Sequence, residues 1–244
     1  MPVLSIVIPA YNEEAFLGTL IERILAVPVE KLGFTKEILV VNDGSRDETA
    51  EIARSFADRY REVRSFSQDN QGKGKAVRHG IREATGDYIL VQDADLEYDP
   101  QDYLALLEGL RQADVVYGSR TLGQRRNQPA FTLFPGRHKE QGFGPWMAGV
   151  LLTLWTALLY GRWITDTLTA YKLYPAQTVK DMRLETTGFE TDHEITAKLI
   201  RQGLRIVEVP IRYYPRSREE GKKIKPRDGW IAVRTLLRFR FAKT

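Results

Sequence analysis

Residues 87–97 read Asp-Tyr-Ile-Leu-Val-Gln-Asp-Ala-Asp-Leu-Glu, and this stretch indicates the fold more directly than any other. Its first part, Tyr88 to Val91, is a short apolar run rich in β-forming residues, which is typical of a buried strand. Carboxylates follow at alternate positions, namely Asp93, Asp95 and Glu97. Alternate side chains of an extended chain point the same way, so we expect these three to converge beyond the strand end.

Carboxylates grouped in this way suit a hard divalent cation. Mg²⁺ and Mn²⁺ prefer oxygen ligands and are commonly shared between one or two carboxylates and the phosphates of a substrate. The sequence Asp93-Ala-Asp95 therefore predicts a clamp for a metal and a diphosphate. The alternative is an acidic, solvated turn, and the motif alone does not exclude it.

The composition fits a globular chain with one large α/β domain. Of the 244 residues, 43% are hydrophobic, which is ordinary for a chain with a full core. Cysteine is absent, which excludes disulfides and zinc–thiolate sites and gives no sign of an oxidising compartment. The chain starts directly in a strand pattern without the features of a secretory signal, so we expect a cytoplasmic location.

The positive charge is concentrated near the C-terminus. Residues 205–244 hold 12 Lys or Arg and 4 Asp or Glu, a local charge of +8, whereas the whole chain has +4. This imbalance indicates a local anionic partner such as phosphate or lipid headgroups, or else a solvated basic tail.

Strand and helix patterns alternate over the first 120 residues. Apolar, β-rich runs predict strands at 3–8, 37–41, 63–66, 88–91 and 114–117. Helical spacing predicts helices at 14–26, 48–60, 75–84 and 102–111. This order predicts an α/β fold, a largely parallel sheet with helices on both faces.

Polar residues cluster where the predicted strands end. These clusters are residues 9–14, 42–45, 93–97 and 118–120. Ligands of such sheets bind beyond the carboxyl ends of the strands. We therefore expect the four clusters to face one ligand crevice.

The second half of the sequence has two candidate membrane-facing helices. Residues 121–144 are predicted as a polar loop, a lid or acceptor loop, and a helix of about 15 residues follows up to Gly161. At roughly 22 Å it is short of the ~30 Å hydrocarbon core, so it is either a core helix or an interfacial one. After a helix at 192–201 and a strand at 205–211, residues 230–241 form a basic amphipathic helix that lies on anionic lipid or docks on the domain.

Together these motifs resemble glycosyltransferase family 2, which has the GT-A (Rossmann-like) fold, and within it dolichyl-phosphate mannose and glucose synthases. The matching segments are 5–14, 40–45, 72–76 with Gly80, 93–95, 118–120, 208–211, Arg216 and 221–223. The resemblance implies a single GT-A domain over 1–244. Residues 1–120 would bind the nucleotide sugar, and 121–244 would face the acceptor and the membrane with interfacial helices.

The resemblance also implies roles for individual residues. The nucleotide-sugar site would comprise Pro9, Ala10, Tyr11, Glu13, Val41, Asp43, Lys73, Asp93, Ala94, Asp95 and Arg120. Mg²⁺ or Mn²⁺ would be held by Asp93, Asp95 and Glu97, the last standing where mannose synthases usually have Gln. Gly72-Lys73-Gly74 lacks P-loop spacing, which excludes an ATPase, so Lys73 meets phosphate or simply opens a helix.

The implied reaction is an inverting transfer of mannose or glucose from GDP-mannose or UDP-glucose to a polyprenyl phosphate. Such an acceptor is already ionised near pH 7 and needs cations rather than a general base. Cations for its phosphate are Arg216, Arg218, Lys222 and Lys223, and the catalytic residues would be Asp95, Arg120, Arg216 and Lys222. We expect a peripheral or monotopic enzyme on the inner face of the cell membrane.

Three other functions remain open at this point. A family 2 enzyme could act on a sugar hydroxyl with a base from residues 190–194, where we expect Glu194 to be structural and leave Asp192 open. The basic C-terminal end could form a nucleic-acid-binding module, but that function does not account for the polar strand ends, and we expect no nucleic-acid partner. A non-catalytic sugar-nucleotide binder is the third. The three histidines show no metal-ligand spacing and are expected at the surface.

Overall fold

The computed structural model describes residues 1–126, 128, 134, 136–138, 142–215 and 226–242. Over this part of the chain a seven-stranded sheet has the order β3-β2-β1-β4-β6-β5-β7. The strands are β1 (Val3–Ala10), β2 (Thr35–Asp43), β3 (Val63–Gln68), β4 (Tyr88–Val91), β5 (Val115–Ser119), β6 (Lys172–Pro175) and β7 (Ile206–Pro210). Only β6 runs antiparallel to its neighbours within this sheet. The predicted mostly parallel α/β architecture is confirmed.

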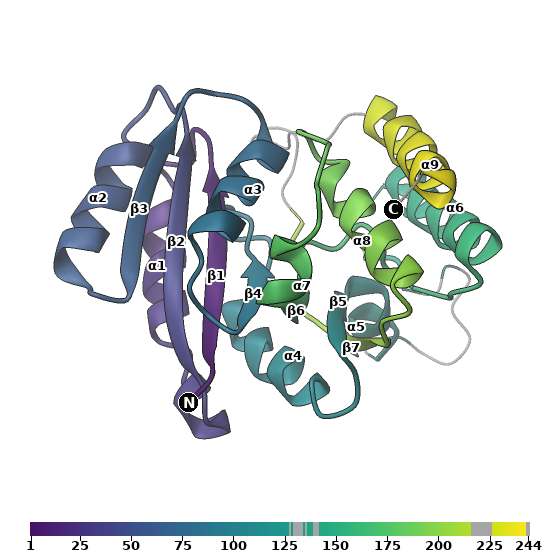
Figure 1. The fold of residues 1–244 in the computed structure, drawn as a ribbon, viewed down its shortest axis with the longest axis horizontal. Coiled ribbons are helices and arrows are strands. Elements are labelled where there is room, and N and C mark those ends of the chain that lie inside the picture. Colours follow the sequence, from purple (N-terminus) through teal and green to yellow (C-terminus); the bar gives the residue numbers. More distant parts are fainter. Residues whose placement is uncertain (127, 129–133, 135, 139–141, 216–225, 243–244) are drawn as a thin grey trace.

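Helices cover both faces of the sheet (Figure 1). They are α1 (Leu17–Leu25), α2 (Thr49–Arg59), α3 (Lys73–Glu83), α4 (Tyr103–Gly109), α5 (Arg120–Arg126), α6 (Phe143–Tyr160), α7 (Ala176–Lys180), α8 (Thr191–Arg201) and α9 (Pro226–Phe241), with short 3₁₀ turns at Val29–Leu32 and Pro100–Asp102. Side chains of a strand alternate between faces. In β1, Ile6 and Ile8 pack with α1, α2 and α4, whereas Val7 packs with α3, α7 and α8.

A further layer lies outside α8, where α6 and α9 pack beside each other (Figure 1). Their shared cluster contains Leu152 of α6 and Ala232, Leu236 and Phe239 of α9. The hydroxyl of Tyr160 donates to the carbonyl of Leu236 at 2.6 Å. This pair is therefore fixed to the body of the protein along one face.

The outer face of α6 is apolar and exposed. Leu151, Leu154 and Leu158 are 57%, 48% and 76% exposed, and only 17% of the residues of α6 are buried. By length and composition this helix could cross a membrane. It has 18 residues, about 27 Å, so the expected length of about 15 residues was too short. The helix is therefore not a fully buried core helix: one face packs on α9 and the opposite face is exposed.

Two further differences from the sequence-based elements lie in the second half of the chain. The expected polar loop at 121–144 begins with α5, although several residues between α5 and α6 lie outside the described part. Strand β6 and helix α7 were not predicted. β6 begins with a lysine and ends with a proline, so it lacks the continuous apolar run by which β4, of the same length, was predicted.

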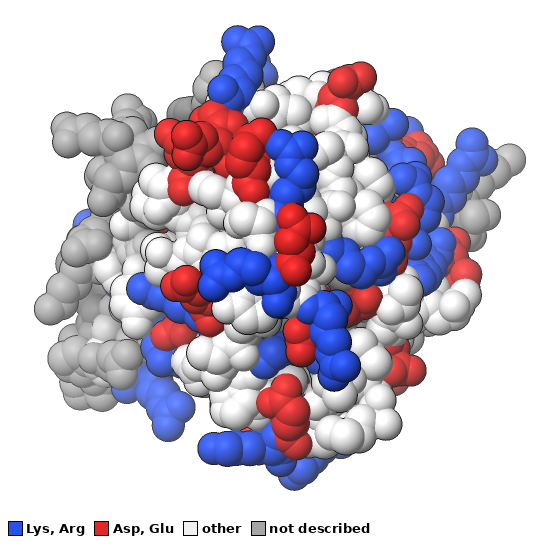
Figure 2. Space-filling model, turned by 90° about the vertical axis from the view of Figure 1, so that its left-hand side faces the viewer, with Lys and Arg blue, Asp and Glu red and all other residues white. Residues whose placement is uncertain are grey.

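The face formed by α2 and the edge strand β3 carries interspersed basic and acidic side chains (Figure 2). Arg64 of β3 pairs with Glu37 at 3.6 Å and lies 3.9 Å from Glu83. Charged residues at the edge of a sheet oppose pairing with another chain. The charges on this edge thus disfavour pairing of β3 with a strand of another chain.

Candidate active site

The loops after β1 and β2 brace each other at the carboxyl edge of the sheet. The backbone N–H of Asn12 donates to Ser45 Oγ at 3.0 Å, and the N–H of Arg46 donates to Asn12 Oδ1 at 2.9 Å. Asn12 has a left-handed φ of 51°, which Asn tolerates better than most residues. The candidate nucleotide-site residues lie on this braced edge, with Pro9 opposite Val41 in the sheet and Ala10, Tyr11 and Glu13 continuing into the loop.

Asp43, at the end of β2, is 3% exposed and holds the loop that leads into α3. Its Oδ1 accepts from the N–H of Gln71 at 3.0 Å, and its Oδ2 accepts from the N–H of Gly72 at 2.9 Å. Gly72 has a φ of 93°, a conformation that glycine adopts readily. The structure thus gives Asp43 a loop-ordering role, and any nucleotide contact would share these oxygens.

Lys73, the first residue of α3, meets two carboxylates from distant parts of the chain. Its Nζ is 2.6 Å from Asp93 Oδ1 and 3.7 Å from Asp192 Oδ2. Burial acts to lower the pKa of Lys73, but the charges of Asp93 and Asp192 outweigh it and raise the pKa. The lysine is therefore a permanent cation beside the Asp93-Ala-Asp95 motif.

The acidic motif is turned rather than extended. β4 ends at Val91, and the chain bends through 94–97, so alternate side chains do not line up as they would in a strand. Glu97 Oε2 accepts from the Tyr213 hydroxyl at 2.8 Å, and Asp95 Oδ1 accepts from the Glu97 N–H at 3.2 Å. Within the described ranges, three or more acidic or histidine side chains do not gather as a metal cage. The predicted convergence of three carboxylates is thus not seen.

Asp93 and Asp95 still have the donor chemistry for Mg²⁺ or Mn²⁺. A magnesium ion is typically bound by one or two carboxylates together with substrate phosphates and water. Two carboxylates beside Ala94, facing Lys73, fit a cation that takes its other ligands from a diphosphate. The carboxylate of Glu97 fits less well, because one of its oxygens is engaged by Tyr213.

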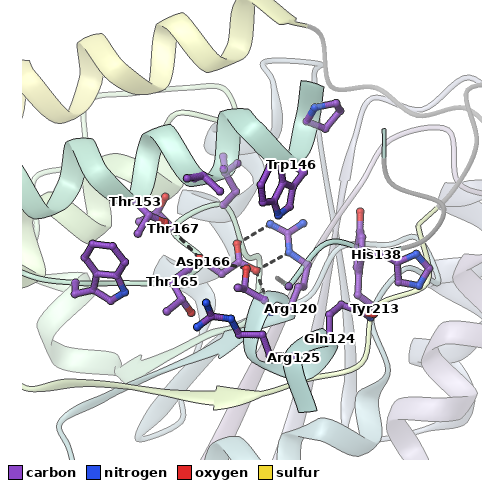
Figure 3. Close-up of a pocket in the computed structure, with 17 residues that line it drawn as sticks. Arg120, Gln124, Arg125, His138, Trp146, Thr153, Thr165, Asp166, Thr167 and Tyr213 are labelled. Atoms are coloured by element: carbon purple, nitrogen blue, oxygen red, sulfur yellow. Dashed lines mark hydrogen bonds and ion pairs between the residues drawn. The ribbon is translucent and has the colours of Figure 1, made fainter. Parts of the chain in front are cut away.

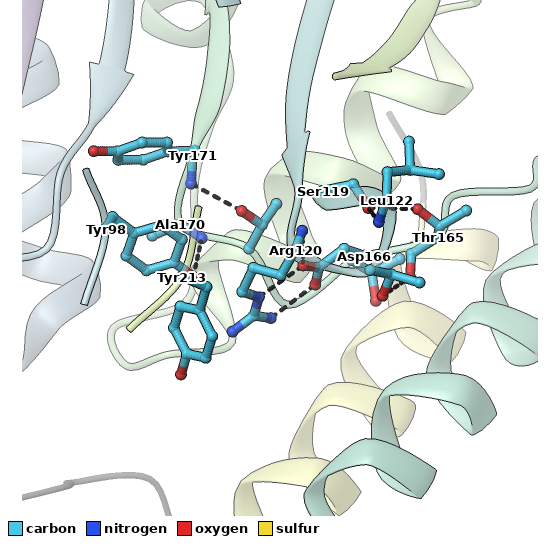
Figure 4. Close-up of polar contacts among 12 residues, drawn as sticks. Tyr98, Ser119, Arg120, Leu122, Thr165, Asp166, Ala170, Tyr171 and Tyr213 are labelled. Carbon is cyan, nitrogen blue, oxygen red and sulfur yellow. Dashed lines mark hydrogen bonds and ion pairs between the residues drawn. The ribbon is translucent and has the colours of Figure 1, made fainter. Parts of the chain in front are cut away.

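Arg120 follows β5 directly and is held by Asp166 (Figure 4). Its Nε and Nη2 donate to the two oxygens of Asp166, each at 2.7 Å, and its backbone N–H donates to Oδ2 at 3.0 Å. The guanidinium lies 4.9 Å from the ring centre of Tyr213 and 5.9 Å from that of Tyr98. Bidentate pairing fixes the plane of the guanidinium, so its orientation is set before any ligand binds.

Glu208 of β7 supports this ion pair from behind. Its Oε1 accepts from the Asp166 N–H at 3.0 Å and from the Thr165 hydroxyl at 2.8 Å, and its Oε2 accepts from the Thr165 N–H at 2.7 Å. Burial raises the pKa of Glu208, and the hydrogen bonds from Thr165 only partly oppose that shift. Glu208 therefore holds the segment of Asp166 in place, and Asp166 in turn holds the side chain of Arg120.

Arg120 and Asp166 lie at one side of a cavity of about 280 Å³ between α5 and α6 (Figure 3). Its polar lining includes Gln124, Arg125, His138, Thr153, Thr165, Thr167 and Tyr213. The apolar lining comes largely from α6 and the loop after it, with Pro145, Trp146, Val150, Trp163 and Leu168. The cavity thus has two kinds of cation, Arg120, which Asp166 holds in place, and Arg125, which is exposed. Its apolar wall belongs to α6.

Some of the predicted site residues lie together in the structure, and others lie outside its described part. The structure brings Lys73 and Asp93 together and places Arg120 in the cavity. Arg216, Arg218, Lys222 and Lys223 lie outside the described residues. Asp166, Thr165 and Tyr213 were not among the predicted site residues. Thr165 and Tyr213 had no local signal in the sequence.

The histidines are not all at the surface. His193 is 3% exposed, and burial together with the nearby Lys172 ammonium lowers its pKa to about 3. His138 lines the cavity. The expectation of surface positions was wrong for His193, because α8 turns that position toward the sheet.

The mostly parallel sheet with helices on both faces is the architecture of the GT-A fold. A solved structure of glucosyl-3-phosphoglycerate synthase from Mycobacterium tuberculosis, in complex with Mn²⁺, UDP and phosphoglyceric acid, aligns with a TM-score of 0.70. The alignment covers 100% of this chain and 80% of that one at 17% identity. This similarity confirms the GT-A fold.

The chain belongs to glycosyl transferase family 2. Residues 5–141 match the family profile of that description, which covers more than half of the sequence. The predicted family and enzyme class are therefore confirmed.

Characterised relatives are similar over most of this chain. A low-salt glycan biosynthesis hexosyltransferase, Agl6, of Haloferax volcanii is 31% identical over 97% of this chain and 53% of its own length. A dolichol-phosphate mannosyltransferase of Pyrococcus furiosus is 31% identical over 89% and 58%. A dolichyl-phosphate β-glucosyltransferase, ALG5D, of Trichomonas vaginalis is 29% identical over 91% and 68%. The chain thus spans little more than half the length of the first two relatives.

Proposed function

We propose that this chain is a metal-dependent, inverting transferase that moves a hexose from a nucleotide sugar to a polyprenyl phosphate at the cytoplasmic face of a membrane. The donor would be GDP-mannose or UDP-glucose. Relatives named as dolichyl- or dolichol-phosphate sugar transferases support the acceptor class. The protein would associate with the membrane surface through α6 and α9.

The observation that carries this proposal is the composition of the cavity beside Arg120. Arg120 and Arg125 supply positive charge, and the wall formed by α6 continues onto an exposed apolar surface. A polyprenyl phosphate has the complementary parts, because its headgroup is anionic and its tail is a hydrocarbon. A soluble sugar acceptor would gain nothing from the exposed leucines of α6.

The carboxylates of the cavity favour an acceptor that is already ionised. Among the described lining residues, Asp166 is the only carboxylate, and both of its oxygens bind Arg120. A hydroxyl acceptor needs a nearby general base, whereas a phosphate monoester is largely ionised at neutral pH. The cavity therefore supports phosphate rather than sugar-hydroxyl chemistry.

The donor side would neutralise the leaving nucleoside diphosphate. Asp93 and Asp95 would hold a divalent cation against its phosphates, which stabilises the negative charge that develops there. Lys73 would supply a further positive charge, and Pro9, Tyr11, Glu13 and Asp43 would border the nucleoside. Arg216 and Lys222 remain the proposed cations for the acceptor phosphate.

Incubation of the purified chain with labelled GDP-mannose or UDP-glucose, Mn²⁺ or Mg²⁺, and a short polyprenyl phosphate tests the proposal. We expect a lipid-extractable glycosyl product that disappears when EDTA removes the metal. The matched control acceptor is the corresponding polyprenol, which keeps the tail and lacks the phosphate. Transfer to the polyprenol or to a free sugar, without transfer to the polyprenyl phosphate, would contradict the proposal.

The sugar-hydroxyl alternative has its expected base in residues 190–194, where the role of Asp192 is open, and His138, which lines the cavity, is a second candidate. If the acceptor is a hydroxyl, Asp192→Asn or His138→Ala should abolish transfer. If the acceptor is a phosphate, both variants should retain activity, because no proton has to be removed.

A further inference from the structure

Lys172 is a buried cation that none of the proposed roles uses. It is the first residue of β6 and is 1% exposed. An isolated charge in a protein interior is strongly unfavourable unless polar groups compensate it. Here the Nζ donates to the carbonyl of Thr167 at 3.2 Å and to the carbonyl of Asp192 at 3.1 Å. The ring centre of Tyr117 lies 5.2 Å away.

The two carbonyls belong to opposite sides of the candidate active site. Thr167 follows Asp166, the carboxylate that orients Arg120 in the cavity. Asp192 is in the first turn of α8, and its carboxylate lies 3.7 Å from Lys73, the partner of Asp93. One ammonium group therefore joins the segment that orders the acceptor side to the helix that contributes to the donor side.

The electrostatic surroundings of Lys172 contain the same groups. Burial lowers the pKa of Lys172, the charges of Asp192 and Asp166 act to raise it, and those of Lys73 and Arg120 act to lower it. Lys172 thus lies within the field of both ion pairs. His193, its neighbour in α8, is kept neutral by burial and by the Lys172 charge, so it does not compete for the two carbonyls as a cation.

We propose that Lys172 is a positioning residue, which fixes the Arg120–Asp166 pair relative to the Lys73–Asp93–Asp192 cluster through the carbonyls of Thr167 and Asp192. This inference rests on the proposed function, because the two groups must approach one donor and one acceptor together. A reaction between two bound substrates is sensitive to their relative placement, and a displacement of about 1 Å can cost about a hundredfold in rate.

The chain offers a matched control at Lys36. Its side chain is 8% exposed, and its Nζ also donates to two carbonyls, those of Leu25 at 2.9 Å and Val27 at 2.5 Å. Lys36 lies in β2 at the end remote from the strand-end loops. Lys36 is less buried than Lys172 and also lies 3.7 Å from Glu30 Oε1. Lys36→Met and Lys172→Met therefore each remove a lysine that joins two carbonyls, one far from the site and one beneath it.

Steady-state transfer and thermal unfolding of both variants test the proposal. We expect both to lower Tm, but only Lys172→Met to lower kcat per folded molecule, by about tenfold to a hundredfold. Lys172→Arg keeps a cation with several donors and should recover part of the lost kcat. It also serves as the test variant if Lys172→Met does not fold. If the wild-type protein is active and the two variants Lys172→Met and Lys36→Met have equal kcat, the inference is overturned. The proposed function would still stand in that case.

Amide hydrogen exchange gives a readout that does not depend on activity. In Lys172→Met we expect faster exchange at 167–171 and at 192–196 together, and in Lys36→Met at neither segment. Faster exchange in only one of the two segments, or in neither, would contradict the proposal that Lys172 joins them. If wild-type protein forms no glycosyl lipid under any condition, the proposed function fails, and the exchange result still decides whether Lys172 joins the two segments.

Discussion

At the scale of single residues, Lys73 and a divalent cation would compete for one oxygen. Lys73 Nζ is 2.6 Å from Asp93 Oδ1, and its positive charge opposes a second cation on that carboxylate. A metal held there would displace the ammonium, which would then be free to meet donor phosphate. We therefore expect Lys73→Met to raise the affinity for Mn²⁺ in the absence of donor by about tenfold, or about 1.4 kcal/mol.

Titration of free Mn²⁺ by electron paramagnetic resonance measures this affinity directly. The control is Lys75→Met, which removes a lysine from the same helix, α3, that has no ion pair with Asp93 in the described structure. We expect unchanged Mn²⁺ binding in the control. Weaker Mn²⁺ binding in Lys73→Met would show that the lysine supports the metal rather than competes with it.

Glu194 has the structural role expected of it, and its lowered pKa predicts how the stability of the fold depends on pH. It is fully buried, and its carboxylate accepts from the N–H groups of Glu185 and Thr186 and from Lys198 Nζ. Burial acts to raise its pKa, but these hydrogen bonds outweigh it and lower the pKa below the ordinary 4.5. The stabilisation is thus complete above pH 4.5 and is lost as the pH falls through the lower folded-state pKa.

Glu194→Gln should reduce the free energy of unfolding at neutral pH by about 2 kcal/mol, because an amide cannot accept all of these bonds. Urea denaturation at several pH values measures the loss, and the difference from wild type should shrink as the pH falls below 4.5. Glu190→Gln, at a half-buried position with longer contacts to Thr187 and Gly188, is the control and should cost less. A pH-independent difference for Glu194→Gln would contradict the assigned cause.

At the scale of elements, sequence reasoning succeeded where a segment was long and periodic. β1 to β5, β7 and helices α1 to α4, α8 and α9 lie close to their predicted ranges. β6 was not predicted because its interior position depends on contacts outside the strand: its lysine is buried where the carbonyls of Thr167 and Asp192 accept its hydrogen bonds. Local propensity carries no information about such partners.

The same limit applies to the site. Strand-end clustering predicted that Asp93 and Arg120 share one edge of the sheet, because parallel strands bring their carboxyl ends to one edge, and both do follow strand ends, those of β4 and β5. The pairing of Arg120 with Asp166, 46 residues away, depends on how α6 and the following loop return to the sheet. Neither residue type nor spacing specifies that return.

The exposed face of α6 yields a prediction about membrane binding. Leu151 and Leu154 are about half exposed, so replacing them changes little packing. Burial of a whole Leu side chain in an apolar phase contributes about 1.5–3 kcal/mol. We expect Leu151→Gln with Leu154→Gln to weaken binding to anionic vesicles by about tenfold or more, while Gln preserves the helix.

Co-sedimentation with vesicles measures this binding, and thermal unfolding verifies that the fold is retained. The control pair, Leu151→Met with Leu154→Met, keeps both positions apolar and should bind like wild type. Equal vesicle binding by the Gln and Met pairs would show that this face of α6 does not contact lipid.

At the scale of the whole molecule, the second half of the chain completes the sheet that the first half begins. Within the described strands, β5 pairs only with β6 and β7, and both follow residue 171. β6 also lies between β4 and β5. The core cluster that contains Leu106 and Val116 includes Tyr171 and Ile211 as well. Elements from both halves of the chain therefore share one sheet and one core cluster.

We accordingly expect a fragment of residues 1–141, which contains the family-matched segment, to lack a cooperative fold. β5 would have no partner strand, and burial of its apolar residues would be lost. Residues 1–244 should unfold in a single transition, because neither half buries its core alone. Circular dichroism melts and amide chemical-shift dispersion compare the two chains. A cooperative melt and well-dispersed spectrum for the fragment would show instead that the nucleotide-binding half folds independently, and that the acceptor half is an addition to a finished domain.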